Sequence, residues 1–537
     1  MMKKKVVALL MAVTMLIGCL AGCAGDEKTQ GNGEKVTLTV GIPQRTTVSD
    51  YDDNAFTKYV EENLNMELEF VYFSSEPGEY KQQLTLATSS GEELPDVLWG
   101  FTDMGRSTVN QFGEDGYFID LTDLIEKHAV NYKNQLSTIS EEARELIKVM
   151  GTNNSDGCFY AMPTYTSSMV ADYMQNMMTI NQTWLDAVGM TAPTNVDELR
   201  AVLKAFKTKD PNGNGQDDEV PILSSDIMYY IINAYVYYNL TYPFNVTDGK
   251  VWNPVATDEY RQALIYLNSL YKEELFSSLN LTATFTDIKN LVSGNGSTAR
   301  VGIWSGHPLN MTTSKCEVLD QYVALNPLAD ASGRGGYGVQ QPNYLVYGGY
   351  ITKDCEDQEA AMRFFDFFYL DETAIRLRHG ERDVDWEEGT GTSYYGTEAI
   401  IRVINANAVL EGSQTWGNTG TTFMNPKNNL AIATTGVGRE AQIGRICEEH
   451  MSVMNGFNRP SERIEYLAYS DDEQAVKDEL EKAYSSYVHE ARCFFINGDL
   501  DPNSDKDWNE YLSQLEKYGA SQLLKITQSA YDATNKK

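Results

Sequence analysis

Two kinds of hydrophobic pattern alternate along the first hundred residues of the chain. Residues 35–42 and 66–72 carry apolar side chains at every second position, which predicts strands, and residues 94–99 predict a third strand. The segments 55–63 and 80–89 between them have the apolar spacing of helices. Strands and helices in this alternating order predict an α/β lobe.

The remaining chain continues the mixed pattern, with predicted strands at 220–223 and 348–352 and predicted helices at 182–188, 257–274 and 357–370. The helix predicted at 195–206 has one apolar face, and Thr194 is placed to cap its start. The segments 471–490 and 507–532 are predicted to be helical, and no internal repeat of fixed period is visible.

A loop rich in oxygen-bearing side chains follows the helix at 195–206. Residues 210–221 read DPNGNGQDDEVP, and the first six follow the D-x-[DN]-x-[DN]-G start of an EF-hand calcium loop. The twelfth position, where an EF-hand has a bidentate Glu, is Pro221, so Asp218 and Glu219 would have to complete the ligand set. A loop without an exiting helix has no moving part, and we expect a fixed structural calcium site rather than a switch.

The N-terminus has the pattern of an export signal. Three lysines at 3–5 precede an apolar run over 6–20, which is too short for a comfortable membrane span of ~20 residues. The following Leu20-Ala-Gly-Cys23 resembles a bacterial lipobox, which implies cleavage before Cys23 and attachment of fatty acyl chains such as palmitate to that cysteine. Cys19 ends an alternative of the same form, and a weak transmembrane anchor is the competing interpretation. Residues 23–35 are predicted to be a flexible tether.

Composition removes several classes of function. The formal net charge is −33, which argues against nucleic acid as a partner because phosphate binding needs a basic face. Five cysteines remain beyond residue 23, an odd number without a Cys-x-x-Cys pair, so neither a disulfide framework nor a zinc ribbon is supported.

Several motifs together give the chain a family resemblance. They are the lipobox at Cys23, Leu94-Pro-Asp-Val97, Gly116-Tyr-Phe-Ile-Asp-Leu121, Ile180-Asn-Gln-Thr-Trp-Leu-Asp186 continuing into 210–221, Phe495-Ile-Asn-Gly-Asp499, and Asp507-Trp-Asn-Glu-Tyr511. In this order the chain resembles the large lipoprotein branch of the extracellular solute-binding proteins of ABC importers, which includes alginate-binding and many oligosaccharide-binding proteins.

The resemblance implies a two-lobed, periplasmic-binding-protein-like α/β fold of class II type, with a hinge and a helical C-terminus. Lobe one would hold 36–172 and 337–403, and lobe two 173–336 and 404–537, after a signal peptide at 1–22. It also implies that the 210–221 loop binds Ca²⁺ through Asp210, Asn212, Asn214, the carbonyl of Gln216, Asp218 and Glu219.

A carbohydrate site needs flat aromatic platforms with polar groups at their rims. Four tryptophans near predicted loops are candidates for such a site: Trp99, Trp304, Trp386 and Trp416. Gln44, Tyr165, Tyr337 and Arg382 are further candidates, and a surface or core role is the alternative for each of the eight. Trp184 and Trp508 lie on apolar helix faces and are expected in the core.

Two motifs that suggest other chemistry are rejected. Gly333-Arg-Gly-Gly-Tyr-Gly338 fits G-x-G-x-x-G, but no strand precedes it and Pro342 follows it, so we expect a flexible loop between lobes rather than a dinucleotide site. Cys447 and His450 lie on one predicted helix, and we expect a solvated helix edge there rather than a nucleophile and base, because catalytic pairs are usually assembled from distant segments. The sequence holds no G-x-S-x-G and no H-E-x-x-H motif.

The sequence therefore predicts a monomeric binding protein rather than an enzyme. It would be held by lipid at the outer face of the bacterial cytoplasmic membrane, capture an oligosaccharide and deliver it to ABC permease subunits. The alternatives are a surface glycan hydrolase or lyase, which would need an acid pair ~5–10 Å apart, and a lipoprotein that senses solute.

Overall fold

The computed structural model describes residues 35–46, 48–153, 155–167, 177–224, 226–239, 242–313, 315–338, 344–393, 397–405, 414–417, 420–424, 431–433, 439–454, 458, 460–464, 466–467 and 469–535. The predicted signal peptide, Cys23 and all but the last residue of the predicted tether lie outside these residues.

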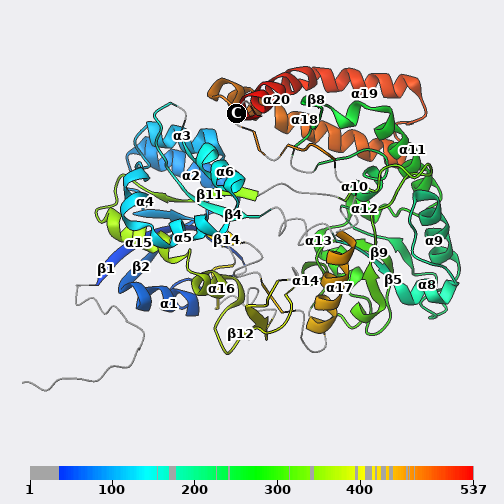
Figure 1. Ribbon diagram of the computed structural model, residues 1–537, viewed down its shortest axis with the longest axis horizontal. Helices are drawn as coiled ribbons and strands as arrows, with labels where there is room; N and C mark the ends of the chain where they lie inside the picture. Colours follow the sequence, from blue (N-terminus) through cyan, green and yellow to red (C-terminus); the bar gives the residue numbers. More distant parts are fainter. Residues whose placement is uncertain are drawn as a thin grey trace, which may run out of the picture. The chain divides into compact units, whose positions relative to one another are not determined.

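The first of two large sheets has six strands in the order β14-β4-β11-β3-β1-β2 (Figure 1). Its strands are β1 (Val36–Pro43), β2 (Met66–Phe73), β3 (Val97–Trp99), β4 (Met162–Thr166), β11 (Tyr344–Ile351) and β14 (Phe423–Met424). Strands β2, β1 and β3 are parallel, as the predicted strand and helix alternation requires, whereas β11 is antiparallel to both β3 and β4.

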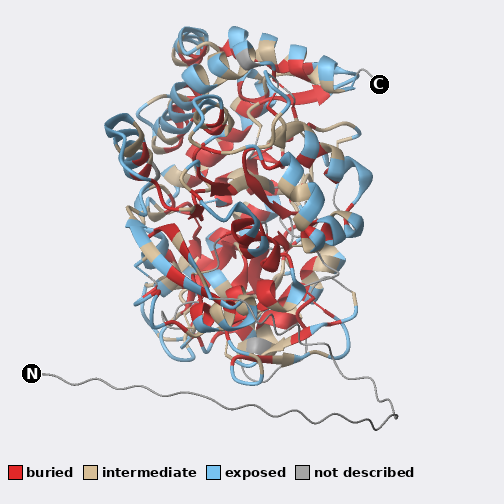
Figure 2. Ribbon diagram, turned by 90° about the vertical axis from the view of Figure 1, so that its left-hand side faces the viewer, coloured by how far each residue is buried: buried red, intermediate tan, exposed pale blue. Residues whose placement is uncertain are grey.

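Among the described residues, eight helices precede or follow the strands of this sheet in the chain. They are α1 (Ala55–Leu64), α2 (Pro77–Ser90), α3 (Arg106–Glu114), α4 (Thr122–His128), α5 (Val130–Thr138), α6 (Glu141–Gly151), α15 (Gln358–Phe367) and α16 (Asp371–His379). Helix α15 packs against β1 and β11 and buries Phe364, Phe365 and Phe367. Figure 2 shows that buried residues lie on the strands and exposed residues on the outer faces of the helices.

The second large sheet has four strands in the order β10-β5-β9-β6. They are β5 (Met178–Asn181), β6 (Val220–Ile222), β9 (Val301–Ser305) and β10 (Tyr322–Ala324). The accompanying helices are α8 (Gln182–Val188), α9 (Val196–Thr208), α10 (Ile227–Ile232), α11 (Asp258–Lys272), α12 (Leu279–Thr282), α13 (Phe285–Val292) and α14 (Pro308–Met311), with 3-10 turns η1 (Pro254–Ala256) and η2 (Leu319–Gln321).

Helix α9 shows how the sequence specifies this second core. Its predicted apolar face is buried, with Leu199, Leu203 and Phe206 fully enclosed. The capping residue differs from the prediction, because the side chain of Asn195 accepts the backbone N–H groups of residues 197 and 198. Thr194 instead donates its hydroxyl to Glu198.

Two small ribbons and the C-terminal helices complete the fold. The ribbons pair β7 (Asn245–Thr247) with β8 (Lys250–Trp252) and β12 (Trp386–Glu388) with β13 (Ile401–Val403). The helices are α17 (Arg439–Met454), α18 (Asp471–Asn497), α19 (Asp505–Lys517) and α20 (Ala520–Asn535). Trp508 of α19 joins Trp184 of α8 in the core of the second sheet, as expected for both.

One expected lobe boundary falls before residues that belong to the first sheet. We assigned 404–537 to lobe two, but β14 pairs with β4, and Trp416 packs beside Trp99 in the first core. These contacts are made by Trp416 and by the two residues of β14. Such short segments have no hydrophobic period that would predict a strand or helix from the sequence. Trp416 and β14 therefore belong with the first sheet, and the remaining division into lobes stays a proposal.

Candidate functional site

The loop that begins at Asp210 is folded by its own side chains. The Asp210 carboxylate accepts the backbone N–H of Asn214 at 3.1 Å and that of Gly215 at 3.0 Å. Asn214 in turn accepts the N–H of Gln216 at 2.7 Å. Asp210, at φ 43°, and Gly215, at φ 71°, take the left-handed backbone that such a tight turn needs. The predicted turn is therefore present, and the predicted ligand residues lie in one short loop.

The acidic residues of the loop have different surroundings. Hydrogen bonds from Asn214 and Asn212, at 3.0 Å and 3.2 Å, hold the pKa of Asp218 below its usual value. Burial raises the pKa of Glu219, whose Oε1 is enclosed and has no hydrogen-bond partner among the residues that the structure describes. A buried carboxylate oxygen without a donor is costly, and a cation would relieve that cost.

The donor set of this loop suits calcium better than a transition metal. It consists of carboxylate and amide oxygens and a backbone carbonyl, the hard ligands that Ca²⁺ prefers. Among the described residues no group of three or more His, Cys, Asp or Glu side chains is arranged to hold a metal. The carboxylates of the loop are therefore too few to hold calcium by themselves. The asparagine side chains and the Gln216 carbonyl would have to be ligands as well.

Three of the four predicted tryptophan platforms are core residues. Trp99 and Trp416 lie with ring centroids 5.8 Å apart in the first core, and Trp304 packs on Tyr322 at 5.7 Å in the second core. All three indoles are 0 % exposed. Trp416 also donates its Nε1–H to Thr57 at 2.8 Å. None of the three has a ring face that a ligand could reach in this conformation.

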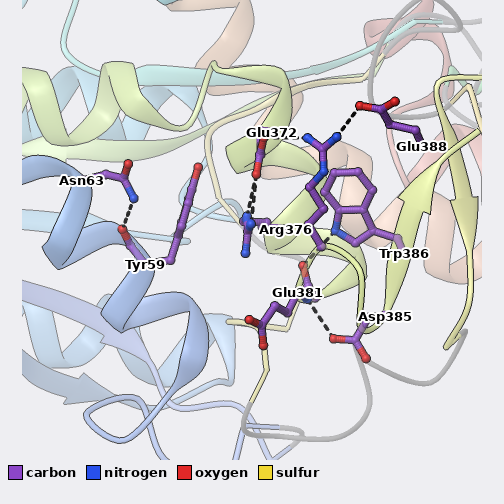
Figure 3. Close-up of polar contacts among 10 residues, drawn as sticks. Tyr59, Asn63, Glu372, Arg376, Glu381, Asp385, Trp386 and Glu388 are labelled. Carbon is purple, nitrogen blue, oxygen red and sulfur yellow. Dashed lines mark hydrogen bonds and ion pairs between the residues drawn. The ribbon is translucent and has the colours of Figure 1, made fainter. Parts of the chain in front are cut away.

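Trp386, at the start of β12 (Figure 3), forms one contact group with Arg382, which precedes this strand. The guanidinium of Arg382 lies over the Trp386 ring, 5.5 Å from its centroid, and the indole N–H donates to the carbonyl of Gly380 at 3.0 Å. Arg382 also forms ion pairs with Glu388 and, at 3.4 Å, with Glu372. Trp386 and Arg382 therefore contact each other, and Arg382 also forms ion pairs with two carboxylates.

The neighbouring Arg376 repeats this arrangement on α16. Its Nε and Nη2 both donate to one oxygen of Glu372 at 3.0 Å, and its guanidinium lies 4.5 Å from the centroid of the Tyr59 ring. Figure 3 shows the contact between Glu372 and Arg376, and Glu372 also pairs with Arg382. Glu372 therefore links α16 to the ribbon, and a structural role explains Arg382 without a ligand.

The three remaining candidates differ in exposure. Tyr165 is buried between Leu345 of β11 and Phe423 of β14, whereas Gln44 is exposed after β1. Tyr337 is half-buried and packs edge-to-face on Tyr237 with ring centroids 5.7 Å apart. Of the aromatic candidates, Tyr337 alone keeps part of its ring accessible.

The G-x-G-x-x-G segment packs on the residues that follow α10. The N–H of Tyr337 donates to the carbonyl of Asn233 at 3.4 Å, and the Asn458 amide donates to the carbonyl of Gly335. A Cβ on Gly335 would lie 2.0 Å from the Ala234 carbonyl oxygen. Close backbone packing explains this glycine, and no dinucleotide loop is present here.

Two pockets were not predicted from the sequence. One, of about 140 Å³, lies among α3, α6 and β11 and includes Arg106, Met150 and Tyr347. The other, of about 370 Å³, includes Tyr235, Glu259 and Asp330. Their residues come from segments far apart in the chain and share no motif, so a sequence signal could not have found them.

Cys447 lies in an environment that suppresses reactivity. It is buried with its Sγ 3.5 Å from Nε2 of His307, and burial raises the pKa of its thiol. Burial also lowers the pKa of His307 to about 3 and that of His450 to about 4. A protonated thiol beside neutral imidazoles, closed off from solvent, does not form an attacking thiolate.

Comparison with known proteins identifies the family. The model of the bacterial extracellular solute-binding proteins matches residues 46–375. The chain belongs to this family. It therefore has the two-lobed binding-protein fold and binds a solute, and it is not an enzyme, which confirms the resemblance seen in the sequence.

Two curated relatives match different shares of the chain. The fructooligosaccharide ABC transporter substrate-binding protein FusA of Streptococcus pneumoniae is 23% identical, covering 97% of this chain and 96% of the relative. The lipoprotein LipO of Bacillus subtilis is 25% identical over 51% of each chain.

Two solved structures share the fold. A FusA EF-hand mutant in complex with fructo-nystose has a TM-score of 0.73 at 21% identity, covering 93% of this chain and 99% of that one. The alginate-binding protein AlgQ2, in a structure without calcium ion, has a TM-score of 0.68 at 22% identity, with 94% and 99% covered.

None of the described helices is both long enough and apolar enough to span a bilayer.

Proposed function

We propose that this chain captures an oligosaccharide outside the bacterial cell and delivers it, as a monomer, to the permease of an ABC importer. The observation that carries the proposal is the match to FusA along almost the whole of both chains. An insertion of a different domain would have broken that match, so the chain has the same parts as a protein named for fructooligosaccharide uptake.

The proposal includes a lipid anchor at Cys23. The lipobox and the polar stretch behind it support this anchor, as does the similarity to a protein named as a lipoprotein. Replacing Cys23 with Ala should release the protein from membranes into the medium, which fractionation and labelling with a radioactive fatty acid would detect. Continued labelling of Cys23→Ala would exclude Cys23 as the acceptor.

Tyr337 is the aromatic residue we propose for ligand contact. Its half-buried ring, stacked edge-to-face on Tyr237 and next to the Asn458 amide, combines an apolar face with polar groups, as sugar binding requires. The buried indoles Trp99, Trp304 and Trp416 are better explained by core packing.

Titration calorimetry against a panel of neutral and acidic oligosaccharides tests this function. We expect at least one to bind without being cleaved. Tyr337→Ala should weaken that binding about tenfold, equal to ~1.4 kcal/mol of lost aromatic contact. Tyr165→Phe, a change in a buried ring, should leave affinity unchanged. Absence of binding across the panel, or cleavage of any glycan, would refute the proposal.

Calcium belongs to the same proposal as a structural ion of the 210–221 loop. Its ligands would be Asp210, Asn212, Asn214, the carbonyl of Gln216, Asp218 and Glu219. The unpartnered Oε1 of Glu219 and the preformed turn support this set. Bound calcium would supply positive charge that offsets the mutual repulsion of the loop carboxylates.

A native-state ligand stabilises the fold by mass action, so calcium at 100 times its dissociation constant should add ~2.7 kcal/mol. We therefore expect a calcium chelator to lower the melting temperature, and Asp210→Asn to remove most of the difference between calcium and chelator. Magnesium should restore less, because it needs a smaller octahedral site. Identical melting curves in calcium and chelator would exclude a structural calcium ion.

A further inference from the structure

The loop carboxylates of the proposed calcium site already have internal partners. Asp210 is held by backbone N–H groups, and Asp218 accepts the amides of Asn212 and Asn214 through Oδ1. The second oxygen of Asp218, Oδ2, faces an arginine from another segment. This arginine is Arg300, and its Nε atom lies 3.5 Å from Oδ2 of Asp218.

Sheet register fixes the position of this arginine. Val220 of β6 pairs with Val301 of β9, and the N–H of Val220 donates to the carbonyl of Arg300 at 2.8 Å. Asn212 also reaches this segment, donating to the carbonyl of Ala299 at 3.3 Å. Arg300 therefore lies beside the loop because of β-pairing and not by the chance orientation of a long side chain.

The Nε atom of Arg300 has no hydrogen-bond partner among the described residues. This atom is buried, so the ion pair with Asp218 is its main compensation. The Arg300 side chain is 37% exposed and that of Asp218 26%. This charge is close enough to act on the loop and is shielded from full screening by water.

We propose that Arg300 is a built-in counter-ion that takes the place of calcium at Asp218 when the metal is absent. The inference rests on the calcium site proposed above and concerns a residue outside its ligand set. Calcium must displace the Arg300 contact from Oδ2 and bind near its positive charge. Arg300 thus lowers the affinity of the loop for calcium and preserves the loop fold without it.

The physical basis is competition between two positive charges for one carboxylate. A dication bound through Asp218 would lie within a few ångströms of the guanidinium, and an exposed ion pair of this kind is worth a several-fold change in affinity. EF-hand loops gain affinity from ligand charge, and this loop has Pro221 in place of the final Glu. A further loss from Arg300 makes it a site for calcium-rich surroundings.

Calcium titration of the purified protein and three variants tests this role. Arg300→Gln keeps a polar side chain and removes the charge, and it should tighten calcium binding about five- to tenfold. Arg300→Lys keeps the charge and should stay within about twofold of the wild type. Arg402→Gln removes an arginine paired with Glu387 on the β12–β13 ribbon, and it controls for the change in net charge.

Melting temperatures supply a second readout. In chelator, Arg300→Gln should melt below the wild type, because Asp218 then has no positive partner, and calcium should restore it fully. Unchanged calcium affinity, or unchanged melting in chelator, would each overturn the counter-ion role. So would a variant that fails to fold even in calcium, since calcium would then not replace the missing charge.

The design separates this inference from the calcium site itself. If neither the wild type nor any variant binds calcium, the structural calcium site is wrong and the counter-ion role falls with it. If the wild type binds calcium and Arg300→Gln binds it no more tightly, the site stands and Arg300 has no part in it.

Discussion

Three buried histidines make stability depend on pH at the scale of single residues. Burial lowers the pKa of His307 and His379 to about 3 and that of His450 to about 4. Between pH 6.5 and 5 the unfolded chain takes up protons at these residues and the native state does not. The free energy of unfolding should therefore fall as the pH falls, by ~1.4 kcal/mol per pH unit for each fully titrating histidine.

Chemical denaturation in chelator at intervals between pH 7.5 and 5 measures this slope. His379→Gln should reduce the slope by about one histidine's share, ~1.4 kcal/mol per pH unit at most. A free energy that stays flat from pH 6.5 to 5 would show that these imidazoles titrate in the native state.

Two glycines of one segment separate backbone conformation from close packing. Gly333 and Gly335 have φ angles of 83° and 80°, but only Gly335 faces the Ala234 carbonyl, and a Cβ on Gly333 would meet nothing within 4 Å. Gly333→Ala should cost ~1 kcal/mol for the left-handed backbone alone. Gly335→Ala should cost ~3 kcal/mol or more, because a backbone atom cannot move aside.

Urea unfolding of both variants tests this pair. Equal losses would mean that the segment shifts away from Ala234 at no cost, and the packing explanation would then fail. The result also bears on the sequence motif, because it assigns one glycine of G-x-G-x-x-G to contact with the protein itself.

Single residues also show where sequence reasoning reached its limit in the candidate site. The loop at 210–221 could be predicted, because its ligands are close in sequence and each position has a fixed geometric role. The tryptophans could not be assigned. Trp99 ends a three-residue strand and Trp416 lies on no periodic apolar segment of the sequence, so no period indicates which way either side chain points.

At the scale of elements, long periodic segments were predicted well. Helix α9 and strands β1 and β2 lie within two residues of the expected bounds, since each has a repeated apolar face. The prediction was poorer where pairing is short or distant. Strand β14 has two residues, and its place in the first sheet depends on β4, more than 250 positions earlier.

Helix α18 carries a buried arginine that holds it to α10. Arg492 is 2% exposed, its guanidinium lies 4.7 Å from the ring centroid of Tyr229 and 5.7 Å from that of Tyr238, and its Nη2 donates to the Tyr229 hydroxyl at 3.3 Å. Among the described residues no carboxylate pairs with it. Aromatic faces, rather than an opposite charge, compensate for its burial.

Substitutions of Arg492 test that compensation. Arg492→Lys keeps a buried charge but loses the planar stacking, and it should cost ~3 kcal/mol. Arg492→Met loses the cation–π contacts and also the cost of burying a charge, so it should stay within about 1 kcal/mol of the wild type. Thermal unfolding that ranks Met below Lys would show that the charge itself is required.

For the whole molecule, each sheet is assembled from segments that are far apart in the chain. Strands β11 and β14 of the first sheet follow all four strands of the second sheet in the sequence. The order of strands along the chain therefore does not show which lobe each strand belongs to. The hydrophobic pattern could not supply a division into lobes, and the one taken from the family resemblance stays a proposal. Trp416 and β14 lie with the first core, although that proposal assigned them to lobe two.

The two-lobed fold leads to one prediction for the whole molecule. A solute bound between two lobes stabilises the closed arrangement over the open one, because it contacts both lobes only when they close. Addition of a binding oligosaccharide should therefore reduce the radius of gyration measured by small-angle X-ray scattering. At 100 times its dissociation constant, the ligand should also stabilise the protein by ~2.7 kcal/mol. Calcium alone should raise stability without the change in radius, since its proposed ligands all lie in one loop. A sugar that stabilises the protein at constant radius would place its binding site within a single lobe.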